Sequence, residues 1–254
     1  MLAASILCIA ASSCQKDDVA SAPRIPSIET LRIDFSAIPS TKAGYHDKEY
    51  AELVDVLENV WNHIYDHVVD VPLRGLEIVA DARPVRDGHL WTWKVSDNDF
   101  LGRTYEVTLT GREHGSKVDW ALSVSRNGFG GFQNYTWITG WSKKDGSEGQ
   151  WSVSVGPDDL DLLVTSDWKV KDGSVSSCRL TYNLSHALGT IGAFFNGSYI
   201  EYFKGASDNA YTDTLQMCYY QLGHIAVDAT IEWNSRTRAC RFKRGQSENW
   251  VEFR

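Results

Sequence analysis

Two histidines have the spacing that comes closest to a metal site. His63 and His67 are four residues apart, so on a helix both imidazoles would project from one side and could ligate one ion. Ile64 follows His63, however, at the position where a zinc protease carries the glutamate that acts as general base. Histidines beside an apolar helix stripe are commonly half-buried structural residues. We therefore predict no metal and no cofactor, and keep His63 and His67 as weak candidates only.

Acidic and nucleophilic residues form no recognisable catalytic pattern. Asp158, Asp159 and Asp161 follow Pro157, but the segment lacks the glycine and the regularly spaced oxygen ligands of a calcium loop, and a solvated turn is the simpler interpretation. The chain contains no Gly-x-Ser-x-Gly elbow. Scattered carboxylates do not define a glycosidase without geometry. We predict no catalytic residue and favour a protein that is not an enzyme.

Aromatic residues near a glycine-rich turn are the best candidates for ligand contacts. Exposed aromatic rings stack on sugars or hold a partner surface, whereas rings in phase with aliphatic neighbours belong to the core. The candidate contacts are Phe129, Phe132, Tyr135 and Trp141. This rim would suit a glycan or a protein. The concave face of a sheet under a helix is the second location, and it would suit an apolar ligand.

Most of the chain has the period of a β-strand. Apolar and polar residues alternate in Trp91–Val95, Tyr105–Leu109, Val118–Val124, Trp151–Val155 and Ile225–Trp233, among others, as in antiparallel sheets with one buried face. Five Asx-Gly pairs favour tight hairpin turns between such segments: Asp87-Gly88, Asn127-Gly128, Asp145-Gly146, Asp172-Gly173 and Asn196-Gly197. The pattern predicts an up-and-down meander of about ten to twelve strands, curled into a barrel or half-barrel.

One amphipathic helix is predicted before the meander. Leu53, Leu57, Trp61 and Ile64 recur at three- and four-residue spacing, which predicts a helix over about 47–69 that packs on the sheet. A short strand is expected at Leu31–Ser36, and the period of two begins near Leu73. We expect residues 28–254 to form a single β-rich domain.

Charge and cysteine content restrict the function further. The formal net charge of -8 argues against nucleic acid, since phosphate binding requires a concentrated basic face. Three cysteines follow position 14, namely Cys178, Cys218 and Cys240. We expect all three to be unbonded, with Cys178 and Cys240 in the inward phase of their strands and Cys218 out of phase.

The first residues have the features of an export signal. Leu2–Ala11 is an apolar run of signal-peptide length, well short of a membrane-spanning helix. Small residues lead into Cys14, and Gln15-Lys16-Asp17-Asp18 follow. This stretch resembles a bacterial lipobox followed by the surface-export signal of Bacteroidetes lipoproteins. The resemblance implies a signal peptide over 1–13, a lipidated Cys14 with a flexible tether over 14–27, and attachment to the outer membrane, at the cell surface or alternatively on the periplasmic face.

The meander itself resembles Bacteroidetes lipoproteins of unassigned function. The residues that carry the likeness are Tyr105–Gly111, Trp137–Trp151 and Ile231–Ser235. These are strand and turn residues, so the resemblance implies a common fold and no shared chemistry. We expect a binding, adhesion or structural module of unknown ligand. A carrier of apolar cargo is the first alternative, and a hydrolase acting on polysaccharide is the second.

Lipidation of Cys14 is directly testable. Cells that express the protein and grow on labelled palmitate should incorporate label into it, and Cys14→Ala should abolish the incorporation, because two or three acyl chains on one cysteine are what hold such a protein on a membrane. The matched control is Cys8→Ala, which should keep full label. Undiminished label in Cys14→Ala would contradict the anchor.

Overall fold

The computed structural model describes residues 21–33, 36, 38, 48–57, 69–98, 103–128, 130–156, 159–183, 196–205, 210–221, 224–245 and 249–253. Its described helices are the 3₁₀ helix η1 (Ile28–Leu31) and the α-helices α1 (Lys48–Val56) and α3 (Asp70–Ala80). The strands of the first half are β1 (Val85–Asp87), β2 (Leu90–Asn98), β3 (Thr104–His114), β4 (Lys117–Arg126), β5 (Phe132–Lys143), β6 (Glu148–Gly156) and β7 (Asp159–Lys171). Those of the second half are β8 (Ser174–Tyr182), β9 (Tyr199–Lys204), β10 (Asp213–Gln221), β11 (His224–Trp233), β12 (Cys240–Arg244) and β13 (Val251–Phe253).

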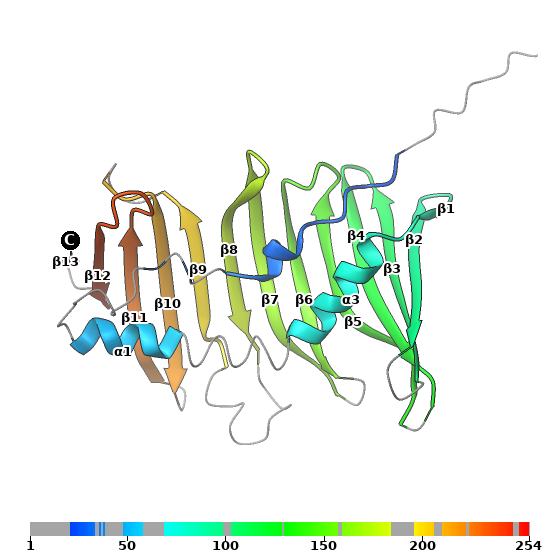
Figure 1. Cartoon of the computed structure of the whole chain (residues 1–254), viewed down its shortest axis with the longest axis horizontal. Helices are drawn as coiled ribbons and strands as arrows, with labels where there is room; N and C mark the ends of the chain where they lie inside the picture. Colours follow the sequence, from blue (N-terminus) through cyan, green and yellow to red (C-terminus); the bar gives the residue numbers. More distant parts are fainter. Residues whose placement is uncertain are drawn as a thin grey trace, which may run out of the picture.

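These strands form one antiparallel meander. The thirteen described strands follow one another across a single sheet in chain order. This confirms the predicted fold class, for which about ten to twelve strands were expected. The sheet is open (Figure 1), because β1 pairs only with β2 and β13 only with β12. Of the two predicted forms, the closed barrel is therefore wrong. Both edge strands are three residues long, which limits the unpaired backbone that could recruit another chain.

Four of the five Asx-Gly pairs lie in short hairpin connections, as predicted, whereas Asn196-Gly197 lies near the end of the long connection between β8 and β9. Asp172 and Gly173 join β7 to β8 with φ angles of 52° and 77°, the doubly left-handed backbone of a type I′ turn. That turn matches the right-handed twist of its strands, and a glycine at its second position carries no steric cost. The same local chemistry recurs along the meander, so sequential strands pair without crossover connections.

One face of the sheet contains the core. The tryptophans predicted to be internal are all at most 6% exposed: Trp91, Trp93, Trp120, Trp151 and Trp233. Glycines make room for them, since a Cβ on Gly111 would lie 2.7 Å from the Trp120 ring and one on Gly140 would lie 2.5 Å from the Trp151 ring. We call this face, on which the described helices lie, the helix face, and the other the open face.

N-terminal segments cover the helix face. In Figure 1, α1 lies across the β10–β12 end, α3 lies across the opposite end, and residues 21–33 run along the same face between them. Tyr50 of α1 packs against Phe242 with ring centroids 5.4 Å apart, and Leu53 and Leu57 are each 1% exposed. Each buried aliphatic side chain of this kind contributes about 1.5–3 kcal/mol.

The described end of the predicted tether, residues 21–27, is part of this cover. Ala22 and Ile25 pack against the core, and Pro23 and Pro26 are buried. Proline has no N–H and favours extended backbone, so this stretch lies on the sheet without competing for ladder hydrogen bonds.

Thr30 fixes η1 to the middle of the sheet. Its side chain and backbone are fully buried, and its Oγ1 accepts a 2.8 Å hydrogen bond from Trp151 Nε1 on β6. Its carbonyl accepts from Ser166 Oγ on β7 and, at 3.6 Å, from Cys178 Sγ on β8. Three adjacent strands are therefore bonded to one residue of the covering segment.

Two sequence expectations near the N-terminus differ from the structure, and a third falls partly outside the described residues. Residues 28–31 form η1 and residues 32–33 are not in a strand, so the strand expected at Leu31–Ser36 is wrong over its described part. The helix expected over 47–69 is described only as α1, since residues 58–68, which include Trp61, lie outside the described residues. Residues 70–80 are helical although the period of two was expected from Leu73. Pro72 sits in the first turn of α3, where proline is tolerated.

The three cysteines of the domain are unbonded, as predicted. All three are buried, although burial was expected only for Cys178 and Cys240. Cys178 and Cys240 lie on the helix face, whereas Cys218 pairs with Tyr199 and Asp228 on the open face. Burial raises the pKa of Cys178 from 9.0 to about 12 and that of Cys240 from 9.0 to about 11. These thiols therefore stay protonated and behave as small apolar side chains.

The raised pKa of Cys178 predicts a pH-dependent stability. A thiol with a folded-state pKa of about 12 and an unfolded value near 9.0 contributes its full stability below pH 9 and loses it as pH rises toward 12. In urea melts under reducing conditions, the stability gap between wild type and Cys178→Ala should narrow by about 2 kcal/mol between about pH 8 and about pH 10.5. Exposed Ser174→Ala serves as control and should show no such change. A gap that is equal at both pH values would contradict this burial.

Candidate functional site

A cavity lies between α3 and the β2–β5 end of the sheet. Its volume is about 340 Å³, and most of its lining is apolar. Helix α3 contributes Gly75 and Ile78, and the strands contribute Val95, Tyr105, Val107, Val124, Phe132 and Trp137, with Arg74, Arg126, Asp97 and Asn98 among the lining residues as well. We call it the α3 cavity. Its size is at the lower end of the range typical of small-molecule sites.

Gly75 lines the α3 cavity and contributes no side chain that could fill it. A Cβ placed on Gly75 would meet Leu122 and Val107 at 3.6 and 3.7 Å, which is ordinary van der Waals contact. A glycine in a helix interior costs roughly 0.5–1 kcal/mol relative to alanine. The structure therefore carries a destabilising residue at a position where a larger side chain would extend into the cavity.

Two irregularities in β5 bring the aromatic residues to the cavity. The β4–β5 pairing shifts between Leu122 and Ser123, and again between Val124 and Arg126. Each shift inserts one extra residue into β5, so Phe132, Tyr135 and Ile138 all pair with residues of the helix face at a spacing of three instead of two. Strict alternation would have turned Tyr135 to the open face.

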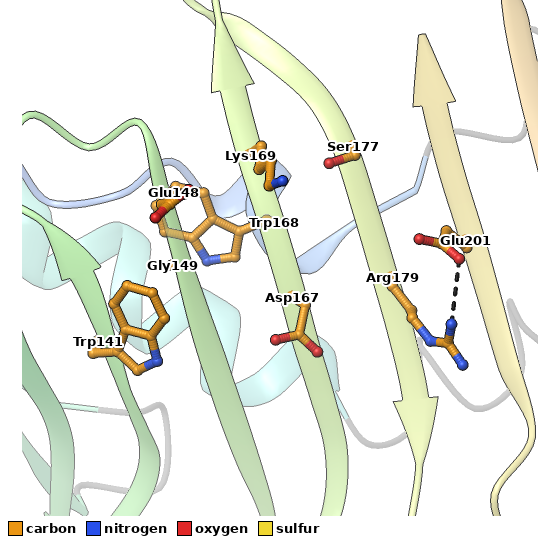
Figure 2. A pocket seen from close by; sticks show the side chains of 9 residues that line it. All are labelled: Trp141, Glu148, Gly149, Asp167, Trp168, Lys169, Ser177, Arg179 and Glu201. Atoms are coloured by element: carbon orange, nitrogen blue, oxygen red, sulfur yellow. Dashed lines mark hydrogen bonds and ion pairs between the residues drawn. The ribbon is translucent and has the colours of Figure 1, made fainter. Parts of the chain in front are cut away.

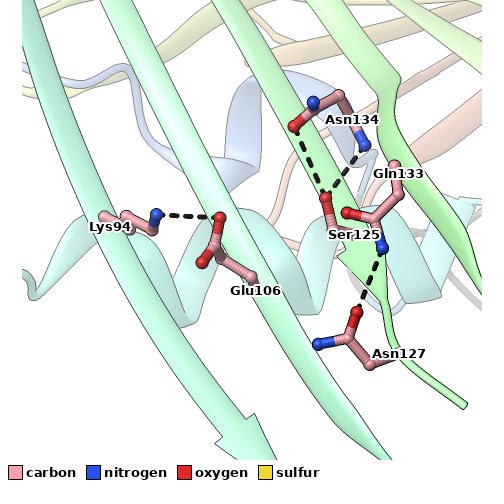
Figure 3. Close-up of polar contacts among 6 residues, drawn as sticks. All are labelled: Lys94, Glu106, Ser125, Asn127, Gln133 and Asn134. Carbon is pink, nitrogen blue, oxygen red and sulfur yellow. Dashed lines mark hydrogen bonds and ion pairs between the residues drawn. The ribbon is translucent and has the colours of Figure 1, made fainter.

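Polar side chains on the open face hold the second bulge (Figure 3). Asn134 has a left-handed φ of 51°, and its backbone N–H donates to Ser125 Oγ at 2.9 Å. Next to it, Gln133 Nε2 donates to Asn127 Oδ1 at 3.0 Å. The backbone group that the bulge removes from the ladder is thus satisfied by a side chain. This network fixes the position from which Phe132 and Tyr135 project.

The aromatic side chains form a continuous wall. Phe132 and Tyr135 have ring centroids 6.1 Å apart and Tyr135 and Trp137 have theirs 5.7 Å apart, both edge to face. The guanidinium of Arg126 lies 5.1 Å from the centroid of Phe132 and donates to the carbonyl of Gly130. A cation is therefore held at one end of an aromatic and aliphatic surface.

Two hydrogen-bond donors of the cavity have no partner. Among the described residues, Arg126 Nε and Trp137 Nε1 are buried and make no hydrogen bond, and both residues line the α3 cavity. The indole nitrogens of Trp168 and Trp233 share this property elsewhere in the core. An unsatisfied buried donor costs about 1–3 kcal/mol. Both nitrogens are shielded from water, so a ligand acceptor would reach them only after a side-chain shift in the cavity wall.

The sequence candidates separate between the two faces. Phe132 lines the α3 cavity and Tyr135 packs beside it, while Trp141 lies on the open face beneath the Lys117 ammonium, 3.9 Å from its ring centroid. Phe129, His63 and His67 lie outside the described residues. Asp159 and Asp161 belong to β7, and Asp158 is also outside the described part. The rim and the concave face, expected as separate locations, share one aromatic cluster.

Several cavity residues were not singled out from the sequence. Trp137 was assigned to a regularly alternating strand, and Arg126 and Gly75 carried no signal of their own. The irregular spacing Phe132, Tyr135, Ile138 is a usable sign of bulges, because it departs from a period of two at the entrance to a strand.

The described residues form neither a cluster of metal ligands nor a membrane-spanning helix. No group of three or more metal-ligating side chains is arranged to hold an ion in the part of the chain that the structure describes. None of the helices within the described ranges has the length and apolar character needed to cross a membrane. Comparison with protein-family models, with curated proteins and with solved structures found no match.

The unpartnered indole of Trp137 gives a stability prediction. Trp137→Phe removes a donor that makes no hydrogen bond, whereas Trp120→Phe removes the 2.9 Å bond from Trp120 Nε1 to buried Ser142 Oγ. Both substitutions delete the same atoms, and Trp120→Phe in addition removes a hydrogen bond and more buried surface. In urea melts, Trp120→Phe should be about 1–2 kcal/mol more destabilising than Trp137→Phe. Equal losses would show that Trp137 has a partner in solution.

Proposed function

We propose that this protein is a lipid-anchored binding module of the outer membrane whose β-domain holds a small amphipathic ligand in the α3 cavity. The observation that carries the proposal is the composition of that cavity. Aliphatic and aromatic walls surround about 340 Å³, and two buried nitrogen donors within the described residues have no partner.

The walls select the apolar part of the ligand. Val95, Val107 and Val124 form the floor on three neighbouring strands, and Phe132 and Trp137 form one side. Burying apolar surface contributes roughly 25 cal/mol per Å², so an alkyl chain or a single ring would supply most of the binding free energy. The rest of the helix face is packed with tryptophan, which limits the ligand to this end of the sheet.

The charged lining residues select the polar part. The charged lining residues are Arg74, Arg126 and Asp97. A carboxylate head group would be attracted by the Arg126 guanidinium, whose Nε makes no hydrogen bond among the described residues. We therefore propose a single-chain carboxylate amphiphile, which joins the binding-module expectation to the apolar-cargo alternative.

The anchor places the domain at a membrane under this proposal. Cys14 would carry the lipid, residues before 21 would connect it to the domain, and the surface-export signal would direct the protein outward. The periplasmic face is the alternative location.

Filling the cavity provides the direct test. Wild-type protein should bind decanoate in isothermal titration calorimetry, and Gly75→Met should weaken binding by at least about tenfold, equivalent to 1.4 kcal/mol, because the flexible thioether would occupy the space next to Val107 and Leu122. Gly75→Ala is the matched control. It should keep decanoate binding and gain about 0.5–1 kcal/mol of folding stability.

The head group is tested separately. Decanol has the same chain without the charge, and Arg126→Gln should reduce the preference for decanoate over decanol while leaving decanol affinity unchanged. Absence of decanoate binding by the wild type, or equal binding by Gly75→Met at unchanged folding stability, would contradict the proposal.

A further inference from the structure

The open face carries a cross-strand row of polar and aromatic side chains. Trp141 on β5, Gln150 on β6, Asp167 on β7, Arg179 on β8 and Glu201 on β9 are direct neighbours in the strand register. Directly paired residues point to the same side of a sheet, so all five project from the open face. Figure 2 shows Trp141, Asp167, Arg179 and Glu201 spread across the neighbouring strands, with the helices behind the sheet. We call it the Trp141 row.

A cleft accompanies this row. It has a volume of about 450 Å³, and its lining includes Trp141, Asp167, Arg179 and Glu201, with Glu148 and Lys169 from the next register position. Strands are about 4.8 Å apart, so four intervals from β5 to β9 give the row a length of about 19 Å. The cleft is therefore elongated across the strands and suits an extended ligand.

Hydrogen bonds within the row hold its groups in place. Gln150 Nε2 donates to Asp167 Oδ1 at 2.7 Å, and Arg179 Nη1 donates to Glu201 Oε2 at 3.3 Å. The Arg179 guanidinium also lies 3.8 Å from the centroid of the Tyr199 ring. Each of these carboxylates can accept further hydrogen bonds, because an ionised carboxylate accepts at about four lone-pair sites.

A second row of uncharged hydroxyls lies beside the first. On each of the strands β5–β8, the residue two positions away from the member of the Trp141 row also lies on the open face. These residues pair with one another across the strands: Thr139, Ser152, Thr165 and Thr181. These residues both donate and accept hydrogen bonds. The surface therefore offers the aromatic rings of Trp141 and Tyr199, several fixed carboxylates and a line of hydroxyls.

From this arrangement we propose that the Trp141 row is a binding site for an extended, uncharged polysaccharide. The apolar face of a sugar ring would stack on Trp141 in place of the Lys117 ammonium. Asp167 and Glu201 would accept from sugar hydroxyls, and Arg179 would donate to them. With the neighbours of Trp141 and Glu148 included, the surface carries four carboxylates and four cations: Asp119, Glu148, Asp167 and Glu201 against Lys117, Lys143, Lys169 and Arg179. This balance of charge gives no attraction for uronate or sulfate polymers. This site is separate from the α3 cavity, which lies on the opposite face.

Affinity gel electrophoresis with soluble polysaccharides tests this site on the intact protein. Migration should be retarded in gels containing mixed-linkage β-glucan or xylan and unaffected by polygalacturonate. Trp141→Ala should weaken retardation by at least about tenfold, because the stacking surface is lost. Trp250→Ala is the matched control. This residue lies beside Arg241 and Lys243, outside both proposed sites, and the variant should be retarded like the wild type.

A milder variant guards against loss of folding. Asp167→Asn keeps the shape of an exposed side chain and should weaken retardation about fivefold, since it replaces two acceptor oxygens with one. Retardation by neither neutral polysaccharide would overturn the inference. So would retardation of folded Trp141→Ala and Asp167→Asn equal to that of the wild type, or preferential retardation by polygalacturonate.

Discussion

The helix face of the sheet is apolar along its full width, and a single sheet leaves such a face in water unless another part of the chain covers it. No second sheet is available among the described residues, so the segment before the meander does the covering. Thr30 is central to it. This residue is bonded to β6, β7 and β8 at once, and α1 and α3 cover the two ends. The positions and side-chain sizes of residues 21–33, α1 and α3 therefore decide where the helix face is packed and where a cavity remains.

The cavity follows from that constraint. Under η1 and α1 the space is filled by Trp151, Trp233 and Phe242, which are at most 2% exposed. Under α3 the helix presents Gly75, and the β5 bulges supply aromatic walls without filling the centre. Protein interiors otherwise pack at nearly crystalline density. A cavity whose wall has unpartnered N–H donors therefore lowers the stability of the folded state. Ligand binding is the use of such a site that our proposal assigns.

Consecutive residues of one strand lie on opposite faces of the sheet and therefore in different chemical environments. Trp141 and Ser142 are neighbours in β5, yet Trp141 lies on the open face and Ser142 is buried on the helix face, where it accepts from Trp120. Period-two alternation alone predicts this separation. Aromatic content by itself could not assign function, because rings of one strand lie on opposite sides of the sheet, as Trp137 and Trp141 do.

Local sequence patterns predicted the strands, the Asx-Gly turns and the buried tryptophans, because these depend on neighbours one to three residues apart. They did not predict η1 or α3. In α3, Pro72 and Gly75 weaken the helical signal, and the packing of Leu73, Leu76 and Val79 on the sheet outweighs intrinsic propensity. The β5 bulges were missed as well, since the position of Tyr135 depends on Ser125 of another strand. The α3 cavity combines these missed elements, so only Phe132 and Tyr135 of its aromatic cluster were candidates in advance.

The central claim is that an amphipathic ligand enters the α3 cavity, and fluorine NMR of 5-fluorotryptophan-labelled protein tests it most directly. Trp137→Phe and Trp141→Phe assign the two relevant resonances, one from each face. The account predicts that decanoate shifts the Trp137 resonance to saturation and leaves the Trp141 resonance unchanged. A Trp137 resonance that does not respond, or equal responses from both tryptophans, would contradict it.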